Sequence, residues 1–388
     1  MQAVTWHGKR DVRVENVPEP EIQASTDAIV RVTTTAICGS DLHLYEVLGP
    51  FLQEGDILGH EPMGIVEEVG PDVKNLVPGD RVVIPFNIAC GSCYMCDRGL
   101  QSQCETTQVN GCGAAIFGYS KLYGQVPGGQ AEFLRVPQAH YGPVKIPHGT
   151  PDERFIYLSD VLPTALQAVE YADIPEGGTV AVLGLGPIGQ MSARIARERG
   201  ARVLAVDPVA ERRDMAARHG IEVLDENEVG DAIRDRTEGR GADSVIDAVG
   251  MEAHGSPGGK LAQQLTSLLP DAVARKLFET AGVDRLGALL NAIDAVRRGG
   301  TLSVIGVYGG MADPLPMLTL FDKQIQVRMG QANVKRWIHD LMPYVNAEND
   351  PLGLQDLATH TLPLAQAPEA YEMFQKKRDG AIKVLLKP

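Results

Sequence analysis

The sequence of 388 residues has no long hydrophobic run and no excess of positive charge. No uninterrupted stretch approaches the roughly 20 apolar residues that a membrane-spanning helix needs, so we expect no membrane partner. The 36 Lys and Arg residues are outnumbered by 50 Asp and Glu residues, which gives a formal net charge of −14. Because so acidic a chain repels phosphate backbones, we expect no nucleic-acid partner.

Cysteine is scarce, and the N-terminus lacks the features of an export signal. Residues 1–7 contain neither the basic segment nor the apolar segment of a secretory leader, so we expect a cytoplasmic location. In a reducing compartment the six cysteines are better explained as metal ligands than as disulfide partners. Glycine is abundant instead, with 42 residues, which indicates many tight turns.

The pattern of apolar runs changes near Asp160. Before it, runs rich in Val, Ile and Thr are separated by Pro and Gly clusters, which predicts an all-β region with strands at 28–36, 64–69, 81–85 and 131–137. After it, apolar runs alternate with helical segments, which predicts a parallel βαβ sheet with strands at 179–183, 201–206, 244–248 and 301–307. The sequence therefore predicts an α/β protein.

We expect two domains. The first covers 1–161 and is completed by 331–388, which contains a helical run at 337–345 and a strand-like run at 382–386. The second covers 162–330 and carries an insertion at about 253–296, where a Gly/Pro stretch precedes two expected helices. The insertion has two possible roles, covering the adenosine end of a cofactor or forming an oligomer contact.

A glycine-rich loop follows the strand expected at 179–183 and opens a helix at 190–199. The GxGxxG pattern alone is a weak signal that any glycine-rich turn can imitate, but here both flanking elements are present. Gly184 permits the tight turn, Gly186 lets a pyrophosphate approach, and Gly189 lets the helix pack on the strand. The helix N-terminus favours phosphate charge. The loop is therefore expected to bind a dinucleotide, through Gly184, Gly186, Pro187, Ile188 and Gly189.

Asp207 ends the next expected strand, 18 residues beyond Gly189. A carboxylate there can accept hydrogen bonds from the adenosine ribose and would repel a 2′-phosphate, which favours NAD over NADP. The alternative is a turn residue before Pro208. Arg212 is also within reach of a ribose or phosphate oxygen, so NADP stays open.

Four cysteines lie close together in the sequence as C-x2-C-x2-C-x7-C. Cys90, Cys93, Cys96 and Cys104 can wrap one tetrahedral Zn²⁺ with no open position, which is typical of a structural site. An iron–sulfur cluster and disulfides are the alternatives. Cys112 is left over, and we expect an unligated thiol there. Cys38 and His60 stand apart, and their spacing alone does not distinguish metal ligands from buried core residues.

In combination, these motifs resemble the zinc-dependent medium-chain alcohol dehydrogenases over nearly the whole chain. The matching features, in order, are Cys38 to Asp41, Gly59 to Glu61, the four-cysteine loop and the glycine-rich loop. Within the family, the chain is most similar to the branch of glutathione-independent formaldehyde dehydrogenase and formaldehyde dismutase. That likeness lies in Pro85 to Asn87, Ala89 and Cys90, Gly128 to Glu132, and Leu158 to Thr164.

The resemblance implies a GroES-like catalytic domain, a Rossmann NAD-binding domain and two zinc ions per chain. It places the catalytic zinc on Cys38, His60 and Asp160, with the carboxylate where many members carry a cysteine. Glu61 would be an alternate ligand or a tuning charge, and Asp41 would hydrogen-bond the second nitrogen of His60.

The resemblance also implies the residues around the reacting groups. The proton would leave through the Ser40 hydroxyl, the cofactor ribose and then His43 at the surface, although a turn hydroxyl and a solvated histidine are alternatives. Phe86 would line the substrate pocket. Cofactor contacts would come from Thr164 at the nicotinamide ring, Gly306 and Val307 at the carboxamide, and Lys383 at the pyrophosphate, where a solvated lysine is the alternative.

The implied activity is hydride transfer between NAD and an alcohol or an aldehyde hydrate, with formaldehyde as one candidate. A reduced cofactor that stays bound could reduce a second aldehyde, which would be dismutation. A polyol or threonine-type dehydrogenase is the alternative enzyme, and a non-catalytic nucleotide-binding regulator is a third reading. We expect a homo-oligomer, a tetramer in preference to a dimer.

Overall fold

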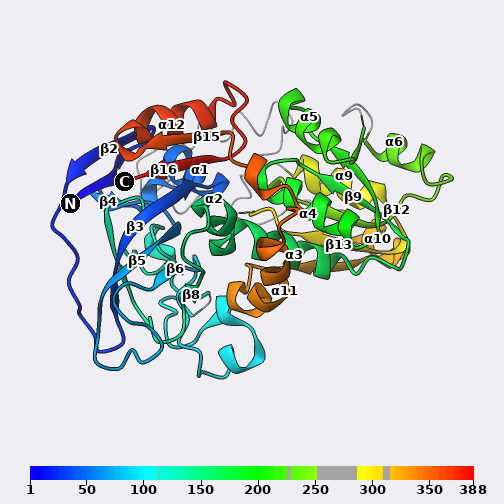
Figure 1. The fold of residues 1–388 in the computed structure, drawn as a ribbon. Coiled ribbons are helices and arrows are strands. Elements are labelled where there is room, and N and C mark those ends of the chain that lie inside the picture. The colour runs from blue at the N-terminus through cyan, green and yellow to red at the C-terminus, as the bar shows by residue number, and fades with distance from the viewer. Residues whose placement is uncertain (112, 225–228, 251–285, 309–314) are drawn as a thin grey trace. The chain divides into compact units, whose positions relative to one another are not determined.

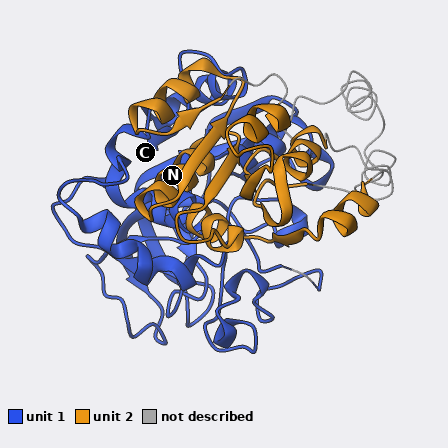
Figure 2. Cartoon of the chain, turned by 90° about the vertical axis from the view of Figure 1, so that its right-hand side faces the viewer, with its two compact units in different colours: residues 1–163, 332–388 blue, residues 164–331 orange. Residues whose placement is uncertain are grey.

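The computed structural model describes residues 1–111, 113–224, 229–250, 286–308 and 315–388, which form two compact units (Figures 1 and 2). Unit 1 consists of Met1–Pro163 and Ala332–Pro388, and unit 2 consists of Thr164–Gln331. The expectation for Cys112 lies outside the described residues. So does most of the expected insertion at 253–296, of which the structure describes only the last part.

Unit 1 is built mainly from two β-sheets. A three-stranded sheet has the order β2-β1-β4, and a seven-stranded sheet has the order β15-β16-β3-β5-β6-β8, with β7 also paired to β3. The strands are β1 (Gln2–Gly8), β2 (Asp11–Asn16), β3 (Ala28–Ile37), β4 (Asp56–Ile57), β5 (Glu61–Val69), β6 (Arg81–Val83), β7 (Phe133–Val136), β8 (Val144–Lys145), β15 (His360–Pro363) and β16 (Val384–Lys387).

Short helices connect these strands. The α-helices of unit 1 are α1 (Gly39–Glu46), α2 (Asp152–Phe155), α11 (Val334–Asn346) and α12 (Ala367–Gln375). The 3-10 helices are η1 (Gly49–Phe51), η2 (Cys96–Arg98), η3 (Gln101–Gln103), η4 (Lys121–Tyr123), η5 (Ile156–Ser159), η7 (Leu354–Asp356) and η8 (Leu364–Gln366). Helix α3 (Val161–Ala172) begins in the last residues of the first segment of unit 1 and continues into unit 2.

The central strand β3 determines where the functional side chains of unit 1 meet. Its buried residues Val30 and Val32 pack in the core, while Arg31 between them is exposed, as the period of a strand requires. Strand β5 runs antiparallel to β3, with Ala36 opposite Glu61. The C-terminal strand β16 pairs with the other edge of β3 (Figure 1). The residues after β3, before β5 and before β16 are therefore brought together.

Unit 2 is a six-stranded parallel sheet flanked by helices. Its strand order is β11-β10-β9-β12-β13-β14, and every pairing is parallel. The strands are β9 (Thr179–Leu183), β10 (Arg202–Val206), β11 (Glu222–Val223), β12 (Ala242–Asp247), β13 (Val296–Val304) and β14 (Gln326–Met329). The helices are α4 (Pro187–Glu198), α5 (Ala210–Arg218), α6 (Val229–Asp235), α9 (Gly287–Ala295) and α10 (Met317–Lys323).

The central strands of unit 2 are nearly continuous apolar runs because helices cover them. In β9, Val180, Ala181 and Val182 are all fully buried, which is typical of a parallel sheet enclosed on both faces. The alternation of strands and helices thus leads to the parallel sheet that the sequence predicted. Within the described ranges, no helix is both long and apolar enough to span a membrane.

Candidate metal and cofactor sites

The glycine-rich loop of unit 2 has the geometry of a phosphate-binding turn. Gly184 has a φ of +88°, a conformation that side chains disfavour. A Cβ at Gly189 would lie 1.8 Å from the carbonyl oxygen of Gly184, so only glycine lets α4 start this close to β9. Gly186 is the N-cap of α4 and Pro187 its first residue. The loop therefore presents a helix N-terminus at the carboxyl end of the sheet's central strand, where a dinucleotide phosphate can be held.

Asp207 supports this loop from the end of β10. It is buried, and its Oδ2 accepts a hydrogen bond of 2.7 Å from the backbone nitrogen of Leu185. Its Oδ1 accepts one of 2.7 Å from Val209, and Arg212 lies 3.5 Å from Oδ2. The turn role that the sequence left open is therefore present. Each carboxylate oxygen has a second lone pair, so the ribose contact stays a prediction.

The four cysteines of the 90–104 loop form one cluster. Their sulfur atoms lie within 4.8 Å of one another, and Cys93 and Cys104 are 3.9 Å apart. A tetrahedral zinc with bonds of about 2.3 Å separates two sulfur ligands by about 3.8 Å. Burial raises the pKa of Cys90, but hydrogen bonds led by that from Thr106 outweigh it and lower the pKa to about 6. Burial raises the pKa of Cys96 instead, so the fit to a closed zinc site rests on the positions of the four sulfur atoms.

A second cluster forms where β3 ends beside the start of β5. Cys38 follows β3 and caps α1, while His60 precedes β5 directly. Asp160 directly follows η5. The last residue of η5, Ser159, accepts a backbone hydrogen bond from Phe86, which follows β6 closely in the chain. Asp160 Oδ2 lies 3.5 Å from Cys38 Sγ and 3.6 Å from His60 Nε2. Together with Glu61, one ligand atom from each residue lies within 4.8 Å of the others.

These donor atoms are spaced for a shared cation. Zinc bonds of about 2.0–2.3 Å in tetrahedral directions would separate sulfur, nitrogen and oxygen ligands by about 3.4–3.6 Å. Burial, with the charges of Asp160 and Glu61, raises the pKa of Cys38 to about 11. Burial lowers the pKa of His60, but Asp41 and Asp160 outweigh it and raise that pKa well above its usual value. Burial is the main cause for Cys38 and the carboxylates are the main cause for His60, and a divalent cation would offset the negative charge of these carboxylates.

Two residues of α1 contact the imidazole of His60 on its two sides. Ser40 Oγ lies 3.1 Å from Nε2, beside the position that a cation would take. Asp41 Oδ1 lies 3.1 Å from Nδ1, and Asp41 Oδ2 accepts a hydrogen bond from the Cys38 backbone nitrogen. The structure thus brings together Cys38, Ser40, Asp41, His60, Glu61 and Asp160.

Lys383 differs from its expected position. It was expected at a cofactor pyrophosphate or in solvent, but its side chain is fully buried and its Nζ lies 2.5 Å from Glu61 Oε1. It also donates to the carbonyl oxygen of Ile37. The pairing of β16 with β3 carries the lysine inward, which excludes the solvated alternative and leaves the pyrophosphate contact a prediction. Burial lowers the pKa of Lys383, but the Glu61 charge outweighs it and raises the pKa above its usual value.

His43 also differs from the expectation. It lies on α1 as the motif required, but only 9% of it is exposed, so it is not the solvated histidine that was expected. Its neighbours Leu42 and Leu44 are buried too, because this short helix is covered along most of its length. The surface end of the expected proton path is therefore not at His43.

Aromatic rings enclose His60. Phe86 and Tyr119 contact its ring edge-on, with centroids 6.3 and 6.4 Å away, and Tyr123 contacts Tyr119. Burial raises the pKa of Tyr119, so its hydroxyl stays protonated. In unit 2, Thr164 lies on α3 and is partly exposed, Val307 is exposed, and a Cβ at Gly306 would collide with Gly250. Their cofactor contacts stay predictions.

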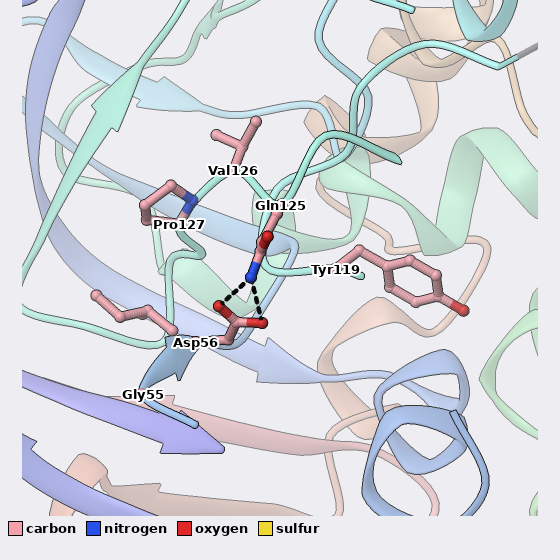
Figure 3. Close-up of a pocket in the computed structure, with 7 residues that line it drawn as sticks. Gly55, Asp56, Tyr119, Gln125, Val126 and Pro127 are labelled. Carbon is pink, nitrogen blue, oxygen red and sulfur yellow. Dashed lines mark hydrogen bonds between the residues drawn. The ribbon is translucent and has the colours of Figure 1, made fainter. Parts of the chain in front are cut away.

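The loop that carries Tyr119 is anchored on its other side. Gln125 donates two hydrogen bonds, of 2.7 and 3.0 Å, to the carboxylate of Asp56 (Figure 3). These residues line a small cavity of about 120 Å³, and the ring of Tyr119 points away from them. None of the residues that line this cavity is a candidate metal ligand, and the hydrogen bonds from Gln125 to Asp56 hold the loop in place.

Sequence reasoning missed the site roles of two residues, Gln130 and Tyr371, and the contact between Lys383 and Glu61. No local pattern shows that Gln130 contacts Asp41 and Tyr371, or that Lys383 contacts Glu61.

Comparisons with known proteins agree with this geometry. Residues 24–148 match the model of the alcohol dehydrogenase GroES-like domain, and residues 187–257 match that of the zinc-binding dehydrogenases. A zinc-type alcohol dehydrogenase-like protein, AdhB of Bacillus subtilis, is 42% identical over the full length of both chains. Formaldehyde dismutase of Pseudomonas putida is 32% identical over 97% of this chain and 95% of its own.

Solved structures show the same relationship. Alcohol dehydrogenase TADH from Thermus sp. ATN1 superimposes with a TM-score of 0.82 at 35% identity, over 100% of this chain and 99% of its own. The predicted fold class, a GroES-like domain with a Rossmann domain, is confirmed. The chain belongs to the zinc-dependent medium-chain alcohol dehydrogenases and is an oxidoreductase of that family.

Proposed function

We propose that this enzyme transfers a hydride between NAD and a small primary alcohol or aldehyde hydrate, with formaldehyde as the aldehyde. The observation that carries the proposal is the cluster of Cys38, His60 and Asp160, three ligands from three separate segments that leave a fourth zinc position open to substrate. A zinc ion bound there would supply a Lewis acid for the substrate oxygen.

The surrounding side chains would handle the proton and exclude water. Ser40 Oγ, 3.1 Å from His60 Nε2, is placed to take the proton of a substrate hydroxyl. Phe86 and Tyr119 place ring edges against the imidazole, which limits access of water to it. The 32% identity to a formaldehyde dismutase supports a one-carbon substrate.

The cofactor assignment rests on Asp207. Its carboxylate at the end of β10 disfavours a 2′-phosphate, which supports NAD. Arg212 supports NADP as the alternative, because its guanidinium lies 3.5 Å from that carboxylate. Among similar structures, one was solved with NADH and another with NADP, so the fold accepts both. A substrate of the polyol or threonine type stays the second candidate for the reaction.

We further propose a homo-oligomer, a tetramer in preference to a dimer. Strand β14 ends the described sheet of unit 2, and apolar side chains there and on α10 are exposed: Met317, Leu318, Phe321, Val327 and Met329. An edge strand with exposed apolar neighbours is suited to pair with its own copy across a two-fold axis.

A substrate and cofactor screen tests the proposed reaction. The purified enzyme is supplied with NAD⁺ or NADP⁺ and with formaldehyde, short primary alcohols, polyols or threonine, and reduced cofactor is followed. We expect NAD⁺ to be preferred and formaldehyde or a primary alcohol to react with the highest kcat/KM. In parallel, formaldehyde without added cofactor should yield formate and methanol in equal amounts if cofactor is retained.

Each arm of the screen has a contrary outcome. Turnover of polyols or threonine alone would contradict the proposed substrate class in favour of the second candidate. Preference for NADP⁺ would contradict the assignment from Asp207. Absence of paired formate and methanol would overturn dismutation but not the dehydrogenase reaction.

A further inference from the structure

A line of fully buried polar side chains leads from helix α12 to His60. The Tyr371 hydroxyl donates a 2.8 Å hydrogen bond to Gln130 Oε1. Gln130 Nε2 donates to Asp41 Oδ2 at 3.3 Å, and Asp41 Oδ1 lies 3.1 Å from His60 Nδ1. Tyr371, Gln130 and Asp41 are each completely buried. The line connects residues 241 positions apart in the chain.

The amide of Gln130 can take only one orientation. Its Nε2 faces two acceptors, the Ala36 carbonyl oxygen at 3.2 Å and Asp41 Oδ2 at 3.3 Å. A flipped amide would set its oxygen against both of these oxygens in a buried site and lose both hydrogen bonds. The Tyr371 hydroxyl stabilises the observed orientation from the other end. Gln130 therefore always donates to Asp41.

This orientation decides which oxygen of Asp41 faces the imidazole of His60. Asp41 Oδ2 already accepts from Gln130 and from the Cys38 backbone nitrogen, so Oδ1 is the oxygen that lies 3.1 Å from Nδ1. An imidazole that binds a cation through Nε2 carries its proton on Nδ1, and a carboxylate oxygen at this position stabilises that form.

Packing ties Gln130 directly to the backbone beside His60. Gly59 precedes the histidine with a φ of +98°, and a Cβ there would lie 2.3 Å from Gln130 Cγ. The Gln130 backbone nitrogen donates to Leu58, and Gly129 donates to Gly59. The glutamine thus contacts both the carboxylate that orients the imidazole and the segment that carries it.

We propose that Gln130 and Tyr371 are positioning residues that hold Asp41, and through it His60, in the form that binds the catalytic metal. This proposal rests on the proposed metal site at Cys38, His60 and Asp160. Neither Gln130 nor Tyr371 would touch the metal or the substrate. Loss of either should therefore weaken the metal site before it affects the fold around it.

Metal release from Tyr371→Phe and Gln130→Glu tests this role. The zinc-loaded full-length enzyme is mixed with a chelating dye, and the release of zinc from each of the two sites is followed over time. Losing an outer partner of a metal-bound histidine costs roughly 10–100-fold in affinity. We expect release from the Cys38 site to be about tenfold faster in Tyr371→Phe, and faster still in Gln130→Glu, which cannot donate to Asp41. Zinc in the four-cysteine loop should be released as in the unmodified enzyme.

Cobalt substitution supplies a readout that a purely structural effect would not give. The visible bands of cobalt at the Cys38 site should shift in both variants, because the orientation of the imidazole changes. Tyr141→Phe is the matched control, since it removes another tyrosine hydroxyl that pairs with a buried glutamine, Gln101. It should leave release from the Cys38 site and the cobalt spectrum unchanged.

Different results would contradict the positioning role and the proposed metal site on which it rests. Unchanged release and spectra in both variants would overturn the positioning role while the metal site stands. Absence of a second zinc from the unmodified enzyme would overturn the metal site itself. If Tyr371→Phe fails to fold, the Gln130→Glu data decide, because that side chain keeps the size of the original.

Discussion

The Glu61–Lys383 ion pair is the most enclosed charge pair described in unit 1. Both side chains are fully buried, and the charged atoms lie 2.5 Å apart. Burial raises the pKa of Glu61, and the Lys383 charge opposes that shift. Because Lys383 contacts Glu61 from the side of β16, it restrains the carboxylate that stands next to the metal ligand His60. Its other oxygen, Oε2, has no hydrogen-bond partner among the described residues, so the tuning role and the ligand role of Glu61 both stay predictions.

Replacing Lys383 with methionine should destabilise the protein strongly. The change leaves the Glu61 carboxylate buried without its partner, which costs about 3–5 kcal/mol in comparable cases. The double variant Lys383→Met/Glu61→Gln should recover much of this loss, because no buried charge remains. Urea-induced unfolding of the zinc-loaded protein measures both. Lys376→Met, which removes an exposed partner of Glu372, is the control and should change nothing measurable. Equal stability of Lys383→Met and Lys376→Met would contradict this role.

At the scale of elements, the sequence predicted best where the relevant residues are neighbours in the chain. Strand β9 has the predicted bounds, and the helix after the glycine motif is present, although α4 begins at Pro187 rather than at the expected residue 190. The strand expected at 301–307 instead spans Val296–Val304. Strand β13 includes the Gly299–Gly300 pair and ends before Gly306. Apolar composition alone does not reveal that glycines can lie inside a strand that bulges against its neighbour.

The edge formed by α10 and β14 carries a prediction about assembly. Phe321 is 79% exposed, and in a two-fold contact it would meet its own copy. Phe321→Glu should therefore replace an apolar contact with two facing charges and shift the protein to a smaller species. Light scattering after size exclusion gives the mass. Val77→Glu, which changes an exposed apolar residue of unit 1, is the control. An unchanged mass in Phe321→Glu, or a monomeric unmodified protein, would contradict the proposed contact.

At the scale of the whole molecule, the family could be identified from motifs, but the contacts that complete the site could not. The four cysteines lie within 15 consecutive positions, so their shared role is visible in the sequence. Glu61 and Lys383 are 322 positions apart, and only the pairing of β16 with β3 brings them together. For the same reason the sequence did not show that Lys383 is buried against Glu61.

The central claim is that Cys38, His60 and Asp160 hold a second zinc that the reaction needs. The most direct measurement is the zinc-to-protein ratio of the unmodified enzyme and of Asp160→Ala, determined with NAD⁺-dependent activity on the same samples. The account predicts two zinc ions per chain in the unmodified enzyme. In Asp160→Ala it predicts one zinc, unchanged occupancy of the four-cysteine loop and at least about a hundredfold loss of activity. An unmodified enzyme with one zinc, or an Asp160→Ala variant that keeps both ions and its activity, would contradict it.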